Sequence, residues 1–323
     1  MPIFDRLSPP RVIAAAGLAC TILALSAQGA RAQQLTHPIY RVAASPAATS
    51  PVEQAVANEP PARTATAGSA RTDTSVQPAS TQSPANPPFD LEARPGEHPL
   101  MPCLRLAKAA LAEMDQRVQD YSATFTKRER LDGELGDSQT IKIRVRHQPF
   151  SVYMQFVQPN PGQEALYVAN QNNGKLVAMG SGWKRRFGKI NLDPDGAMAM
   201  KDQRYPITKA GIKNLTAELI EIAEQDIKYA ECEVNYAPSK IDGRPCTMIE
   251  AVHPVPRSNF RFHKAQIFID NELRLPVAYR AYSWPQEPGG KPVLEEQYIY
   301  TDIQLNNGFT DADFSPENPA LFQ

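Results

Sequence analysis

Hydrophobic and polar residues alternate along most of the chain beyond residue 120, which is the pattern of half-buried β-strands. In the clearest case Ile141, Ile143 and Val145 alternate with lysine and arginine residues. Short turn signals separate such runs, namely Asp132-Gly133, Asn173-Gly174, Asp242-Gly243 and Asp270-Asn271. Residues of these types accept the backbone angles of tight hairpin turns. The pattern predicts about eleven antiparallel strands.

Two stretches instead repeat their hydrophobic residues at spacings of three and four, which is the period of an amphipathic helix. The first runs from about 102 to 119, and a proline suits its first turn. In the second, Ile212, Leu215, Leu219 and Ile222 fall on one face. Each helix therefore has one apolar stripe that needs a partner surface.

The second helix lies in a stretch, 191–222, that resembles neither group of strands around it. The stretch begins with the turn Leu192-Asp193-Pro194-Asp195-Gly196 and is predicted to be an insertion between two halves of an antiparallel sheet. A sheet of this many strands has to curl to protect its edges. We expect a mainly β, α+β fold: a curved, partly open antiparallel β-barrel with both helices packed on its concave face.

The first 32 residues have the features of an export signal. Two arginines precede an apolar stretch, 12–25, that is too short to span a membrane comfortably. Ala30-Arg31-Ala32 is a small-x-small cleavage site. We expect residues 1–32 to be removed and the product to be soluble in the periplasm or cell envelope. An uncleaved anchor and a lipoprotein modified at Cys20 are the alternatives.

Residues 33–99 form a predicted disordered linker that precedes one half-barrel domain, 100–323. The segment is rich in proline, alanine, serine and threonine and shows no period of 2 or 3.6. Such a segment buries too little apolar surface to offset its ordering entropy. It would space the domain from an envelope surface, or be a plain tail without a partner.

Net charge excludes one class of function. The chain has 34 lysines and arginines against 35 acidic residues, a formal charge of −1. A nucleic-acid binder needs a concentrated basic footprint, so no nucleic-acid partner is predicted.

Three cysteines remain after the expected cleavage: Cys103, Cys232 and Cys246. Cys232 and Cys246 flank a predicted hairpin and are the favoured disulfide pair in an oxidising compartment. A tight Asp242-Gly243 turn would place Cys246 opposite Ser239, so bridging would need a bulge or a longer loop.

No stretch carries a complete catalytic or metal site. Asn191-x-Asp193-x-Asp195-Gly196 imitates a calcium loop, but its ligand set has faults and a proline stiffens its middle. Gly136-Asp137-Ser138 lacks the histidine partner that a serine nucleophile needs. His253 and His263 are too few ligands for a metal. We predict no catalytic residues, no cofactor and no metal.

Inward-facing residues give the candidate ligand site. A closed barrel would fill itself with such side chains, whereas an open one under a helical lid can leave an apolar cavity. The candidate lining residues are Phe125, Ile143, Phe156, Leu166, Val168, Trp183, Phe187, Ile212, Leu215 and Leu219. The basic run Lys184-Arg185-Arg186 beside Trp183 is either a solvated strand face or a contact for an anionic lipid head group.

Several motifs resemble those of an uncharacterised secreted bacterial family, domain of unknown function 1571. They are Phe150-Ser151-Val152-Tyr153-Met154, Leu192-Asp193-Pro194-Asp195-Gly196 with Ala199-Met200 and Arg204-Tyr205-Pro206-Ile207-Thr208, Leu275-Pro276-Val277, and Asp313-Phe314 with Asn318-Pro319. The order of elements also resembles the lipoprotein-carrier (LolA/LolB-like) half-barrels. The family resemblance implies no activity, and the carrier resemblance implies a fold only.

The favoured function is therefore a non-enzymatic, exported envelope protein that binds an apolar ligand, a lipid or a lipidated partner, in its cavity. It would lie near the membrane without spanning it. A structural or protein-interaction module with a filled barrel is the first alternative, and a hydrolase or metal enzyme is the second. The sequence does not define an oligomeric state.

Overall fold

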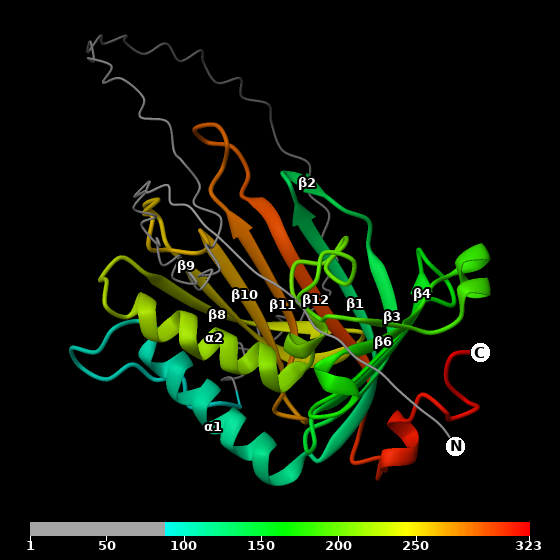
Figure 1. Ribbon diagram of the computed structural model, residues 1–323. Helices are drawn as coiled ribbons and strands as arrows, with labels where there is room; N and C mark the ends of the chain where they lie inside the picture. Colours follow the sequence, from blue (N-terminus) through cyan, green and yellow to red (C-terminus); the bar gives the residue numbers. More distant parts are fainter. Residues whose placement is uncertain (1–87) are drawn as a thin grey trace, which may run out of the picture. The chain divides into compact units, whose positions relative to one another are not determined.

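The computed structural model describes residues 88–323 of the chain. The predicted signal 1–32 and most of the predicted linker lie outside the described residues. The described part forms one twelve-stranded antiparallel sheet with two α-helices (Figure 1). The strands before the insertion are β1 (Asp120–Leu131), β2 (Glu134–Leu135), β3 (Gln139–Arg146), β4 (Ser151–Gln158), β5 (Glu164–Val168), β6 (Leu176–Met179) and β7 (Ile190–Leu192). Those after it are β8 (Glu233–Ile241), β9 (Arg244–Val252), β10 (Lys264–Asp270), β11 (Pro276–Ser283) and β12 (Val293–Leu305).

Strand order shows how the two halves of the sheet meet. The order is β7-β6-β5-β4-β3-β1-β12-β11-β10-β9-β8, with the short β2 paired to β1 outside this path. The two meanders join where β1 pairs with β12, and β7 and β8 are the outer edges. The chain between residues 193 and 232 therefore leaves one edge of the sheet and returns at the other. The predicted insertion, curved antiparallel sheet and open edges are confirmed.

Two α-helices lie side by side on the same face of the sheet, α1 (Met101–Arg117) and α2 (Ile212–Asp226) (Figure 1). Their apolar stripes pack with inward residues of the strands, such as Phe125, Ile141 and Tyr279, in one large core. None of the helices in residues 88–323 is long and apolar enough to cross a membrane.

Gly211 sets the start of α2 because the backbone there lies close to the sheet. Its φ is 106°, and an added Cβ would lie 3.1 Å from the Tyr121 hydroxyl. That hydroxyl accepts a hydrogen bond of 2.9 Å from the backbone N–H of Ile212. A first-turn N–H has no partner within its own helix, so Tyr121 satisfies it from β1.

The convex face of the first meander is covered by the C-terminal residues. Phe314, in the 3₁₀-helix η4 (Asp311–Phe314), and Leu321 pack against Tyr153 of β4 and against Leu166 and Val168 of β5. Tyr153 pairs with Leu166 across the two strands, so both side chains point to the same, convex face. We expected Leu166 and Val168 to face the concave side. This expectation is wrong, because the residues of β5 that face the concave side are one position away.

Residues 182–187 form a 3₁₀-helix, η2 (Gly182–Phe187), where a strand was expected. Glycines with positive φ, 54° at Gly182 and 70° at Gly188, bound the turn. Trp183 and Phe187 point outward from it and are 64% and 63% exposed. They therefore do not lie on the concave face, contrary to the sequence-based expectation.

The cysteines do not form the expected disulfide. Cys103, Cys232 and Cys246 are all free thiols. Cys246 pairs with Ser239 in the β8–β9 hairpin, whereas Cys232 directly precedes β8 and lies seven residues, about 23 Å of extended chain, before Ser239. A disulfide needs its two Cα atoms within about 7 Å. The tight Asp242-Gly243 turn, with positive φ at both residues, fixes this register.

Phe89 and Leu91, which we expected to lie in the linker, are buried. They pack with Ile249 and Ile269 of the second meander. The packed part of the chain thus includes residues before α1.

Candidate functional site

The concave face encloses a cavity of about 560 Å³ between the sheet and the inserted segment. Phe125, Met154 and Phe156 line it from the strands, and Leu215 and Leu219 line it from α2. A second cavity, of about 110 Å³, lies beneath α1 and α2, and Leu219 belongs to both linings. The space under α2 is thus not filled by side chains.

The ten candidate lining residues separate into three groups. Phe125, Phe156, Leu215 and Leu219 line the larger cavity. Ile143 and Ile212 are buried in the core beside it and do not reach its wall. The remaining four lie on the convex face or on η2, as described above: Leu166, Val168, Trp183 and Phe187.

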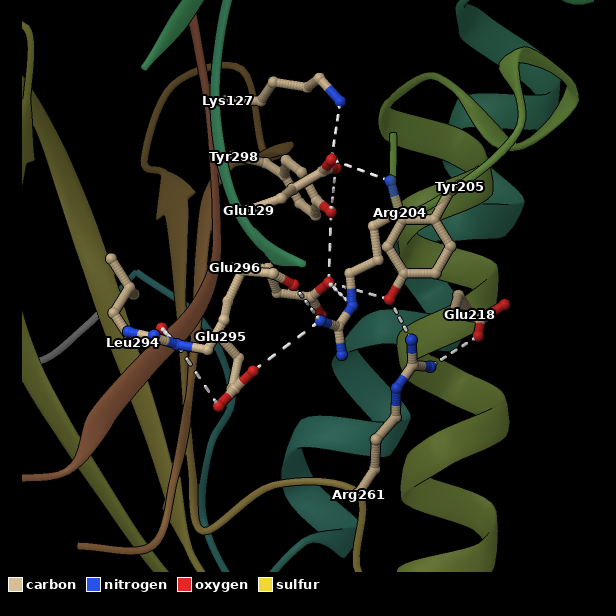
Figure 2. Close-up of polar contacts among 11 residues, drawn as sticks. Lys127, Glu129, Arg204, Tyr205, Glu218, Arg261, Leu294, Glu295, Glu296 and Tyr298 are labelled. Carbon is tan, nitrogen blue, oxygen red and sulfur yellow. Dashed lines mark hydrogen bonds and ion pairs between the residues drawn. The ribbon is translucent and has the colours of Figure 1, made fainter. Parts of the chain in front are cut away.

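One side of the cavity is polar. We call the following residues the polar wall: Lys127, Glu129, Gln203, Tyr205, Glu218, Arg261, Glu296 and Tyr298. They come from β1, β12, α2, the loop before β10 and the inserted segment (Figure 2). Segments far apart in the chain thus meet through charged and hydroxyl groups at one place.

The β1 part of the polar wall is a buried ion pair. The Lys127 ammonium donates hydrogen bonds of 2.8 Å to Glu129 and 2.7 Å to Gln203 of the inserted segment. Glu129 also accepts a hydrogen bond of 3.0 Å from the backbone N–H of Arg204. Lys127 and Glu129 are two residues apart on one strand, so they face the same side as Phe125. The pair therefore fixes the inserted segment to β1.

Glu296 of β12 is the centre of the polar wall. Its carboxyl group accepts a hydrogen bond of 2.8 Å from the Tyr205 hydroxyl and lies 3.2 Å from Nε of Arg204 (Figure 2). The neighbouring Glu295 lies 3.8 Å from both Arg204 and Arg130. Arg204, just behind the wall, thus has two adjacent carboxylates as partners.

Tyr298 links the two acidic groups of the wall. Its hydroxyl lies 2.8 Å from Glu129 and 3.2 Å from Glu296. A hydroxyl has one hydrogen, and the shorter contact, to Glu129, is the better hydrogen bond of the two. Burial raises the pKa of Glu296, and the charge of Glu129 adds to this, although Arg204 and Arg261 oppose it. Glu296 therefore ionises less readily than an exposed glutamate does.

Arg261 connects α2 to the inserted segment. Its guanidinium donates a hydrogen bond of 2.8 Å to Glu218 and another to the Tyr205 hydroxyl, and it lies 5.5 Å from the centre of the Tyr205 ring. Burial raises the pKa of Glu218, but the hydrogen bond and charge of Arg261 outweigh it and leave the pKa lowered. Glu218 is therefore the ionised partner of Arg261.

The histidine pair considered as metal ligands has other partners. The two ring nitrogens of His253 face the Glu231 carbonyl at 3.0 Å and the Asp226 carboxylate at 3.1 Å. Both contacts are acceptors, which favours the charged form of the ring. Burial lowers the pKa of His253, but the hydrogen bonds to Asp226 and Glu231 outweigh it and leave the pKa raised. His263 donates to the His253 backbone carbonyl. Residues 88–323 contain no group of three or more histidine, cysteine or acidic residues that could hold a metal.

The calcium-like stretch is an ordinary turn. Oδ1 of Asp193 accepts a hydrogen bond of 3.0 Å from the backbone N–H of Asp195, and the Asp193 carbonyl accepts one of 3.0 Å from Gly196. These contacts use the oxygens within the turn itself.

Sequence reasoning missed the polar wall, although a signal was present. Lys127 and Glu129 continue the inward positions of Tyr121 and Phe125 on β1. Charged residues at core-facing positions are rare unless they are paired. The same rule could have been applied to the other strands to look for the partners of these residues, such as Glu296.

The fold and the cavity define an open antiparallel half-barrel with a hollow, partly polar concave face. Residues 118–321 match the family model described as "Protein of unknown function (DUF1571)", and the chain belongs to this family. The family expected from the sequence motifs is thus confirmed.

Solved structures of low sequence identity align with part of this chain. A DUF1329 family protein from Desulfovibrio piger has 9% identity and a TM-score of 0.33, with coverage of 66% of this chain and 97% of that one. Lipoprotein LppX from Mycobacterium tuberculosis has 12% identity and a TM-score of 0.32, with coverage of 64% and 98%. A LolA superfamily protein from Nitrosomonas europaea has 12% identity and a TM-score of 0.27, with coverage of 65% and 97%. No curated protein matches the chain.

Proposed function

We propose that this protein is a non-enzymatic protein of the cell envelope that holds a lipid, or the acyl part of a lipidated partner, in its larger cavity. The observation that carries the proposal is the cavity of about 560 Å³ beneath α2, with Phe125, Met154, Phe156 and Leu215 in its lining. Small-molecule sites are concave, mostly apolar and supplied with a few polar groups. The export features of residues 1–32 support the envelope location.

The polar wall limits the chemistry of the ligand. A purely hydrocarbon ligand would leave the hydroxyl and carboxyl groups of the wall against apolar atoms, which is unfavourable. Lys127 and Arg261 each have a carboxylate partner at 2.8 Å, so the wall balances its own charge. A strongly anionic head group would meet no unpaired cation there. The ligand proposed is thus an amphiphile with an uncharged head that donates and accepts hydrogen bonds.

The wall also supports binding over catalysis. Glu129, Glu218 and Glu296 are engaged by tyrosine, lysine or arginine partners. The His253 ring is held by Asp226 and by a backbone carbonyl outside the larger cavity. A general base needs a lone pair that reaches the substrate, and these carboxyl groups are instead engaged in holding the wall together, which supports binding over catalysis.

Native mass spectrometry and lipid extraction of the purified protein test the proposal directly. We expect a co-purified amphiphile in the wild-type protein and saturable binding of a fluorescent polyene fatty alcohol. Met154→Trp should occupy the cavity and reduce probe binding at least tenfold. Gln155→Trp is the matched control, because Gln155 is the next residue on β4 and is exposed on the other face. Its probe binding should equal that of the wild type.

Two results would contradict the proposal. One is a protein that contains no lipid and does not bind the probe, which would favour a structural or protein-interaction module. The other is equal probe binding by the Met154→Trp and Gln155→Trp variants, which would place the bound probe outside the cavity. Circular dichroism of both variants checks that the sheet has formed.

A further inference from the structure

The edge of the sheet beside the cavity mouth carries exposed apolar and basic side chains. We call the following residues the rim patch: Trp183, Lys184, Arg186, Phe187, Ile190 and Met198. The apolar members are 64% (Trp183), 63% (Phe187), 40% (Ile190) and 69% (Met198) exposed. Soluble proteins rarely gather exposed aromatic and long apolar side chains without a binding partner. The rim patch is therefore a candidate docking surface.

The geometry of η2 brings these residues together. The rings of Trp183 and Phe187 are 5.6 Å apart, and the Arg186 guanidinium lies 4.8 Å and 5.1 Å from their centres. Lys184 lies between the two aromatic residues in the sequence. Lys184, Ile190 and Met198 also line the larger cavity. The rim patch is thus continuous with the cavity mouth.

The four basic residues of this segment have two different roles. Arg185 lies 3.5 Å from Glu164 and donates to the Gly162 carbonyl, and Lys189 donates a hydrogen bond of 2.6 Å to the Pro316 carbonyl. These two hold η2 against the body of the domain. Within residues 88–323, Lys184 and Arg186 form no ion pair with a carboxylate. Their charges are available to an external anionic partner.

We propose that the rim patch docks the cavity mouth onto the surface of an anionic phospholipid bilayer. Tryptophan and phenylalanine are favourable at the boundary between head groups and acyl chains, and basic residues beside them attract anionic head groups. An anionic bilayer presents apolar depth and negative charge together, which matches the composition of the rim patch. A docked mouth would let an amphiphile pass between bilayer and cavity without crossing water. The docking itself does not depend on the cavity ligand proposed above.

The test uses the full chain and a signal that is local to the patch. The chain has two tryptophans, Trp183 and Trp284, so Trp284→Phe leaves Trp183 as the only one. This matters because the apolar stretch 12–25 can itself bind vesicles, whereas the fluorescence reports only on Trp183. The vesicles are phosphatidylcholine with and without phosphatidylglycerol, and brominated acyl chains serve as quenchers.

We expect a blue shift and bromine quenching of Trp183 with phosphatidylglycerol vesicles, weakened by salt and absent with phosphatidylcholine alone. Lys184→Ala with Arg186→Ala should weaken this signal roughly 30-fold, since each interfacial cation contributes about fivefold. Lys291→Ala with Lys240→Ala is the matched control, because these lysines are exposed on other loops or strands. The control should bind like its parent.

Three results would overturn the proposal. The first is an unchanged Trp183 spectrum with phosphatidylglycerol vesicles, and the second is equal binding by both double variants. The third is a Trp183 emission that is already shielded before vesicles are added, because another part of the chain or a second copy would then cover the patch. Sedimentation velocity distinguishes a patch covered by another part of the same chain from a patch covered by a second copy. The lysine and arginine side chains that the double variants replace are all exposed, so the urea unfolding midpoints of these variants should match that of their Trp284→Phe parent. Lipid uptake by the cavity is scored separately.

Discussion

Removing the Tyr205 hydroxyl tests whether the polar wall holds the inserted segment on the sheet. Tyr205→Phe deletes one oxygen, which donates to Glu296 at 2.8 Å and accepts from Arg261. The ring and its edge contact with Tyr298, at 6.4 Å between centres, remain. The substitution therefore changes hydrogen bonding with little change in packing.

The expected loss follows from the charge of the two partners. Hydrogen bonds to charged groups contribute about 1.5–3 kcal/mol each, and a deleted partner leaves the other group buried and unsatisfied. We expect unfolding free energy to fall by about 1.5–3 kcal/mol. In a domain of this size each kcal/mol corresponds to roughly 2–4 °C, so the melting temperature should fall by about 3–12 °C.

Urea and thermal unfolding followed by circular dichroism measure this loss, and hydrogen exchange locates it. Exchange should rise first in the amides of residues 193–211, because they lose their link to β12. Tyr229→Phe is the control, since Tyr229 is 40% exposed and its hydroxyl has no hydrogen bond within residues 88–323. A loss below about 0.5 kcal/mol, equal to that of the control, would refute the role given to the polar wall.

Two further predictions concern titratable groups outside the larger cavity. The raised pKa of His253 means that its contribution to stability is present below about pH 6.5 and is lost as pH rises through the folded-state pKa. His253→Gln should lower the free energy of unfolding by about 1–3 kcal/mol at pH 6, and it should weaken the dependence of this free energy on pH, as measured by urea unfolding. An unchanged pH dependence would contradict this prediction. Burial, with Asp226 and Cys103 nearby, raises the pKa of Cys232 to about 12, and burial also raises those of Cys103 and Cys246. Iodoacetamide should modify these three thiols only in denaturant. A peptide map that shows a disulfide between any two of them would contradict this prediction.

Much of the fold was predictable because strand alternation records which side of a sheet is buried. Ile141, Ile143 and Val145 all lie in the core, as their alternation indicated. The facing of β5 was misread because the strand has only five residues, and because its convex-facing residues are buried while Ala165 and Tyr167 on the other face are only partly buried. Its convex side is covered by Phe314, which lies far along the chain and leaves no local trace in the sequence.

The site was only partly predictable for a different reason. A side chain that lines a cavity and one that fills a core have the same apolar character, so Phe125 and Ile143 look alike in the sequence. The difference depends on how far α2 stands from the sheet, which Gly211 and the polar wall set. In η2 the two glycines favoured a turn over the strand that we expected there.

The route of the inserted segment has a consequence for the capacity of the binding site. Residues 193–232 join β7, one free edge of the sheet, to β8, the other, and they also form the cover of the cavity. The cover is therefore a tether of fixed contour length, attached at both sides of the opening. Spreading the two edges must draw α2 toward the sheet, and lifting α2 must bring the edges closer. Among proteins built in this way, we expect the length of the tether, more than the curvature of the sheet, to set the largest ligand that can enter.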